Sequence, residues 1–249
     1  MSVRRVSTLV SDVRSAPAQP AADRPPAWWV VAAAAVAPTL LIGGWIVADM
    51  FQPSSYRWMR DTISALARIG APDRWFMTAA FAGLGVCYLI IAVGLRAAAR
   101  PGRALMFAGG VATIMVSALP LPPVGTSPAH GMVALVGFVV MAIWPIAGAQ
   151  RGGAVDGTPW ALRLPVAAAA TATLLLFDGW FGLSLLPHAL VGVSERATAG
   201  AEALWPLVVV ISTRATRWSF TPVPRASTAG TAFDRVLTER STSDRAPID

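Results

Sequence analysis

Charged residues are scarce in this sequence, and lysine is absent altogether. Of its 249 residues only 13% are charged and 55% are hydrophobic, and the mean hydropathy is +0.58. A soluble domain of this size usually carries about 25% charged residues, so the composition excludes an ordinary soluble domain. Long uncharged runs account for the deficit, and such runs are typical of helices that cross a lipid bilayer.

Cysteine and nucleotide-binding motifs are also scarce or missing. Cys87 is the only cysteine, which excludes an internal disulfide, and its apolar surroundings predict a small buried hydrophobe. The chain has no Walker sequence and no Gly-x-Gly-x-x-Gly fingerprint, so no cofactor is expected. The net charge of +7 does not indicate a nucleic-acid partner, because the arginines lie in loops and tails between apolar runs.

Six apolar segments reach the ~20 residues that a membrane-spanning helix needs. The sequence therefore predicts an all-α integral membrane protein with six transmembrane helices in one bundle. Residues 1–26 and 214–249 are polar and are expected to be disordered tails. The spans are expected at about Ala27–Ala48, Trp75–Leu95, Ala104–Val124, Ala129–Ala149, Leu164–Leu186 and Ser194–Thr213.

The arginines predict how the bundle is oriented. All 20 basic residues are arginines. Most of them lie in the two tails and in the connections 96–103 and 150–163, and few lie in the other three connections. Because positively charged loops stay in the cytoplasm, both termini are expected there, with the first connection, residues 49–74, outside.

This first outer connection contains the pattern of a short helix from Asp61 to Gly70. Asp61 is suited to cap its N-terminus and Gly70 to end it. Ile63, Leu66 and Ile69 would share its apolar face. We expect this helix to lie at the membrane interface, over the mouth of the bundle.

Several short motifs resemble one family in their order along the chain. They begin with Arg60–Leu66 (RDTISAL) and Gly70–Trp75 (GAPDRW), and the resemblance covers roughly residues 40–213. The family is the actinobacterial "domain of unknown function 998". The resemblance implies a six-helix protein of a bacterial plasma membrane and carries over no activity; the family is also distantly similar to eukaryotic six-pass proteins linked to lipid organisation and autophagy. The further matches are Gly94–Arg96, Gly109–Gly110, Ser127–Gly131, Trp144–Pro145, Ser194–Arg196 and Ala203–Pro206.

Two acidic residues lie inside predicted spans. Ionisable side chains within a membrane are costly and mark functional sites by default. Counting ~1.5 Å per residue from the outer helix ends, Asp178 and Glu202 lie at similar depth in the outer half. Pro206 cannot donate to the carbonyl of Glu202, which leaves that oxygen free.

The leading hypothesis is a non-enzymatic membrane protein with an outward-facing polar pocket for a lipid or small amphiphile. The reason for this hypothesis is that the polar residues assigned to the pocket all lie in the outer half of the membrane. Besides membrane lipids, the sequence identifies no partner. The residues expected to form the pocket are Asp178, Glu202, His130, Glu195 and Arg196, with Arg60, Asp61 and Ser64 in the outer-loop helix above it.

Four alternatives stay open from the sequence. Glu202 and Asp178 could serve a small proton-coupled transporter, although no acidic residue lies in the inner half to form a second access route. His130 with Ser64 and Asp61 contains the elements of a hydrolase. The two acids with His130 and His188 are of metal-binding type but lack a local ligand spacing. Alternatively, the acids and His130 serve structure alone.

Overall fold

The structure, a computed structural model, describes residues 25–151, 157–186 and 190–218. Within these ranges the chain is helical, and its only β feature is an isolated bridge between Gln150 and Arg163. The described residues form seven α-helices and one short 3-10 helix. These are α1 (Trp28–Met50), α2 (Ile63–Leu66), α3 (Trp75–Gly94), α4 (Arg100–Ala118), α5 (Pro128–Ala147), η2 (Trp160–Leu162), α6 (Leu164–Ser184) and α7 (Val191–Trp218).

Five of these helices, α1, α3, α4, α5 and α6, are long and apolar enough to cross a membrane. The prediction of a multi-pass all-α membrane protein is therefore supported. The sixth expected span corresponds to α7, which has 28 residues but carries Glu195, Arg196 and Glu202 along its length. It is not among the five, so the count of six stays a prediction.

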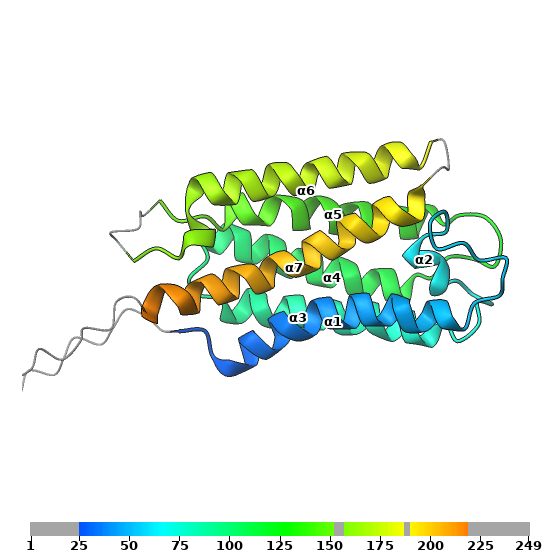
Figure 1. Cartoon of the computed structure of the whole chain (residues 1–249), viewed down its shortest axis with the longest axis horizontal. Helices are drawn as coiled ribbons and strands as arrows, with labels where there is room; N and C mark the ends of the chain where they lie inside the picture. The colour runs from blue at the N-terminus through cyan, green and yellow to red at the C-terminus, as the bar shows by residue number, and fades with distance from the viewer. Residues whose placement is uncertain (1–24, 152–156, 187–189, 219–249) are drawn as a thin grey trace, which may run out of the picture. The chain divides into compact units, whose positions relative to one another are not determined.

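The long helices alternate in direction, and each of the five apolar ones packs against the next in the order α1, α3, α4, α5, α6 (Figure 1). Helix α7 runs obliquely across them between α6 and α1. The hydroxyl of Thr198 on α7 donates to the carbonyl of Phe177 on α6, and Gly200 on α7 faces the ring of Trp45 on α1. Residues 51–74, which we call the capping loop, cover one end of the bundle with α2.

Helices α4 and α7 differ from the prediction at their boundaries. Helix α4 starts at Arg100 rather than Ala104, because Pro101 is suited to the first turn of a helix. It ends at Ala118 rather than Val124, because the prolines that follow cannot continue a helix. Helix α7 extends through residues 214–218, so the predicted disordered tail begins too early. The remainder of both predicted tails lies outside the described residues.

The expected outer-loop helix is much shorter than its sequence pattern. Only Ile63–Leu66 is α-helical, and Thr62 rather than Asp61 caps it, accepting a hydrogen bond from the amide of Ala65 at 3.1 Å. Asp61 instead accepts from the amide of Arg57 at 2.6 Å. Ile63 and Leu66 are buried as expected, but Ile69 is 45% exposed because the helix has already ended.

Close helix contacts depend on glycine at α3 and α4. A Cβ on Gly85 would lie 2.6 Å from the carbonyl oxygen of Gly110, and one on Gly110 would lie 2.8 Å from that of Gly85. Both contacts are with backbone, which cannot move away as a flexible side chain could. Glycine at both positions therefore allows α3 and α4 to pack closely.

Gly85→Ala should lower the free energy of unfolding by about 1–3 kcal/mol, the cost of overpacking a tight interior. Gly182→Ala on α6 is the matched control, since nothing lies within 4 Å of its added Cβ. Unfolding in mixed micelles with increasing denaturing detergent measures both. Equal stability of the two variants would contradict the close approach of α3 and α4.

Candidate functional site

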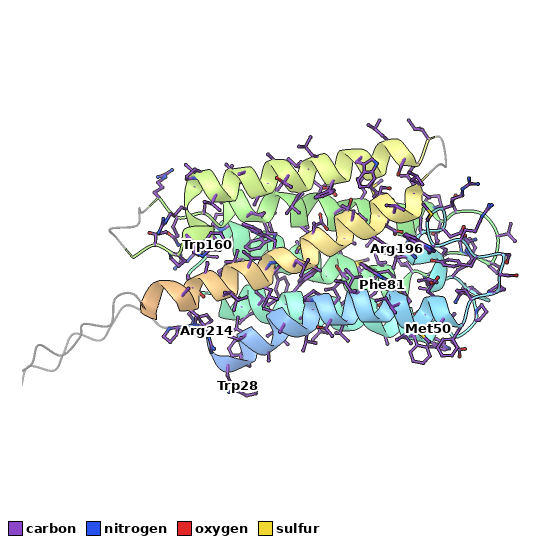
Figure 2. All side chains as sticks on the ribbon, viewed as in Figure 1. Trp28, Met50, Phe81, Trp160, Arg196 and Arg214 are labelled. Carbon is purple, nitrogen blue, oxygen red and sulfur yellow. The ribbon has the colours of Figure 1, made fainter. Side chains whose placement is uncertain are left out.

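A small cavity lies between the helices, directly beneath α2. Its volume is about 70 Å³, which exceeds the ~10–15 Å³ that one water molecule needs. Phe81, one of its wall residues, lies in the half of the bundle that carries α2, whereas Trp160 and Arg214 lie toward the opposite end (Figure 2). The polar lining residues are Ser64, Tyr88, Thr113, Glu195 and Glu202, and the rest of the lining is apolar or glycine.

Glu202 is the least satisfied polar residue of the cavity wall. It comes from α7 and is 4% exposed. Its Oε1 atom is buried and has no hydrogen-bond partner within the described part of the chain. Pro206, one turn further along α7, has no amide hydrogen to give the carbonyl of Glu202. The carboxyl oxygen Oε1 of Glu202 is therefore an available acceptor in the cavity wall, as far as the described residues go.

Asp178 lies on α6, close enough to Glu202 for the two carboxyl groups to interact electrostatically. Both of its carboxyl oxygens are buried and lack a partner among the described residues. It is not part of the cavity wall. An unpaired ionised carboxylate inside a membrane costs several kcal/mol, and two such groups repel, so this pair requires protons or a cationic group.

Glu195 lines the cavity but is already engaged by the capping loop. Its carboxylate accepts a hydrogen bond from the amide of Ile63 at the start of α2, and a second from the hydroxyl of Ser64 at 3.3 Å. It is 4% exposed. Glu195 was predicted as a pocket residue, and its carboxylate lies in the cavity wall while accepting hydrogen bonds at the N-terminus of α2.

Arg196 points away from the cavity and into the capping loop. Its guanidinium donates to the carbonyls of Trp58 and Asp61 at 2.8 and 3.0 Å, and to the hydroxyl of Tyr56 at 2.6 Å. The guanidinium of Arg196 is therefore bonded to the capping loop and does not line the cavity. Burial raises the pKa of Tyr56 to about 12, although the neighbouring charge of Arg196 opposes that rise.

The same contact needs glycine at position 192. The amide of Gly192 donates to the carbonyl of Met59 at 3.1 Å. A Cβ at this position would clash with the carbonyl oxygens of Trp58 and Asp61. Glu195, Arg196 and Gly192 together fasten the capping loop onto the first turns of α7.

His130 lies apart from the cavity and has a structural arrangement of bonds. It is 5% exposed, and its Nδ1 lies 2.7 Å from the carbonyl oxygen of Leu119. A carbonyl only accepts, so Nδ1 carries the proton. The amide of His130 also donates to the side chain of Ser127, which caps α5. His130 thus joins the end of α4 to the start of α5.

The elements of a hydrolase are not assembled. Ser64 bonds to Glu195, His130 to Leu119, and Asp61 accepts from Arg57. Arg60 is exposed on the surface of the capping loop. No three His, Cys, Asp or Glu side chains of the described residues are grouped as a metal ion would need; His188 lies outside those residues.

Sequence reasoning missed the aromatic and apolar part of the site. Tyr88 from α3 is 3% exposed and lines the cavity beside Glu202 and Phe81. Phe138 of α5 completes the aromatic wall. A tyrosine within an otherwise apolar run was the one available signal, since a buried hydroxyl usually needs a partner.

The family described as "Protein of unknown function (DUF998)" matches residues 31–212. The chain belongs to the DUF998 family. The match includes most of α1, the other four apolar helices, the capping loop and every residue that lines the cavity, so the site lies within the shared domain. No curated protein and no solved structure matches the chain. Membership of this family implies no particular activity.

Arg196→Gln should release the capping loop from α7 while leaving the helices folded. Hydrogen–deuterium exchange of peptides covering residues 52–66 is expected to rise at least tenfold, because charge-assisted hydrogen bonds to the loop are lost. Arg60→Gln, the same change on an exposed arginine of the loop, is the control. Equal exchange in wild type and Arg196→Gln would contradict this role of Arg196.

Proposed function

We propose that this DUF998 protein is a non-enzymatic membrane protein that binds a small amphiphile. The polar head of the amphiphile would bind Glu202, and its apolar body would lie against the aromatic wall of the cavity. The observation that carries the proposal is the carboxyl of Glu202, buried and without a partner for Oε1 in the described chain, in a mostly apolar cavity.

The cavity volume supports a head group rather than a whole lipid. About 70 Å³ has room for a few water molecules. A lipid tail would therefore remain between the helices and the surrounding bilayer, or the cavity would widen on binding. Phe81, Leu84, Phe138 and Met141 supply the apolar surface beside the head.

The chemistry of the lining favours a hydrogen-bond donor, and an amine above a hydroxyl. Ionised carboxylates only accept hydrogen bonds. Glu195 is already satisfied by α2, so it contributes negative charge without offering its oxygens. Asp178 adds further negative charge from α6. A cationic head would offset all three and remove the cost of the buried acids.

We also propose the finer topology, with six spans and both termini in the cytoplasm of a bacterial cell. Helix α7 has 28 residues, which is about 42 Å of helix, ample for a bilayer core of about 30 Å. Ala203, Val209 and Val210 are fully buried against the bundle. The distribution of arginines between the two ends orients the capping loop outward.

Glu202→Gln should remove a specific co-purifying molecule. Wild type, Glu202→Gln, Asp178→Asn and the control Asp49→Asn, an acid at the end of α1 outside the cavity wall, are purified in nanodiscs and compared by mass spectrometry. Loss of a charge-assisted hydrogen bond corresponds to about tenfold weaker retention in Glu202→Gln. Asp178→Asn should weaken retention less, because it acts through charge alone.

Identical small molecules at identical yield in all four proteins would overturn the binding proposal. The second candidate function, proton-coupled transport, would then lead. It is favoured by the unpartnered carboxyl oxygens of Asp178 and Glu202 on neighbouring helices. Proton uptake into vesicles by wild type, with none by Glu202→Gln, would decide for transport over binding.

The topology predicts three labelling results in intact cells, with Cys87 replaced by serine. An impermeant maleimide should label a cysteine at Ser54, which is exposed in the capping loop. It should not label one at Arg96, between α3 and α4, or one at Ser241, beyond α7. Labelling at both Ser54 and Ser241 would mean that α7 does not cross the membrane.

A further inference from the structure

We infer that a second site, at the corner between α3 and α4, binds the phosphate of an anionic phospholipid. A hollow of about 470 Å³ lies at this corner, at the end of the bundle opposite the capping loop. Its lining residues are Ala92, Val93, Arg100, Arg103, Ala104 and Phe107. The inference does not depend on the proposed role of Glu202, which lies in a different cavity.

Arg103 is held in place by the end of α3. Its Nε donates to the carbonyl of Ala92 and its Nη2 to that of Val93, both at 2.7 Å. These carbonyls belong to the last turn of α3, where no helical amide remains to pair with them. Within the described chain no acceptor bonds Nη1, so one edge of a fixed guanidinium remains available to a ligand in the hollow.

Arg100 adds a second charge on the same face. It lies three residues before Arg103, so the two side chains are neighbours on the surface of α4, and both line the hollow. Between Asp73 and Asp156 the sequence has no acidic residue, so α3, α4 and α5 offer no carboxylate to either arginine. Two guanidiniums without an acidic partner on these helices favour an anion, and phosphate suits their geometry.

The rest of the hollow selects a phospholipid over a soluble phosphate. Ala104 and Phe107 lie about one and two turns beyond Arg100 along α4. Phe107 is 47% exposed and Val93 57% exposed, on helices apolar enough to cross a membrane. The start of α4 is therefore positively charged, and exposed apolar surface follows along the helix. This order matches a phospholipid, whose phosphate would bind the arginines and whose acyl chain would lie against the apolar surface. Anionic lipids are abundant in the cytoplasmic leaflet, where this end is proposed to lie.

The test is the lipid retained by the full chain in mixed micelles of phosphatidylglycerol and phosphatidylcholine, counted by native mass spectrometry. Arg100→Gln should lower the ratio of bound phosphatidylglycerol to phosphatidylcholine about tenfold, as expected for loss of a charge-assisted contact. Arg103→Gln should lower it too, while Arg103→Lys should retain part of the preference, since it keeps the charge. Arg96→Gln, an exposed arginine of the same connection outside the hollow, is the matched control.

Two outcomes would overturn the inference. An equal loss of phosphatidylglycerol in Arg96→Gln would mean that general charge, and not this hollow, selects the lipid. Inorganic phosphate that displaces the lipid and raises the melting temperature of wild type, but not of Arg100→Gln, would identify a site for a soluble anion. Arg100→Gln leaves the hydrogen bonds from Arg103 to α3 intact. The variant is therefore expected to fold, and a change in its bound lipid reports on the hollow.

Discussion

Hydrocarbon offers no hydrogen-bond partner, so every polar group between membrane-spanning helices has to be satisfied by the protein itself. Most of the buried polar side chains of the described bundle belong to α7. Its Ser194 pairs with Ser184 at 2.6 Å and its Thr198 with the carbonyl of Phe177, which joins it to α6. Glu202 on α7, with Asp178 on α6, is the exception to the rule among the described acids. The unpartnered carboxyl groups therefore differ from the other polar groups of α7, whose hydrogen bonds hold the helices together.

Two adjacent residues of α7 connect the cavity to the surface above it. Glu195 holds the start of α2, and Arg196 holds the preceding part of the capping loop. Ile63 and Ser64, which bond to Glu195, also line the cavity. The roof of the cavity is therefore attached to the helix that supplies its unpartnered acid, and a shift of α7 would move both together.

The positions of most long helices could be predicted from the sequence, but the hydrogen bonds between elements could not. Hydropathy located α1, α3, α5 and α6 to within two residues at each end, because each helix needs a long apolar run regardless of its neighbours. It placed α4 several residues too late, since the prolines that end this helix are themselves part of an apolar run. The cap of α2 could not be predicted, since Asp61 and Thr62 are both good capping residues. The choice depends on Glu195, 132 positions away from Ile63 along the chain. The burial of Glu202 followed from its depth, but the separation of His130 and Arg196 from the cavity did not.

The contacts of Arg196 have a consequence for how this domain can diverge. Apart from Tyr56, its acceptors are main-chain carbonyls, at Trp58, Asp61 and Gly192. Every residue has a main-chain carbonyl, whatever its side chain. These hydrogen bonds therefore constrain the path of the loop backbone but not most of its amino-acid sequence. Relatives can therefore change the outward-facing residues of this loop, and with them the surface shown to the environment, without losing its attachment to the bundle. Of the residues in the contact of Arg196 with these carbonyls, Arg196 and Gly192 are the ones whose identity the bonds require.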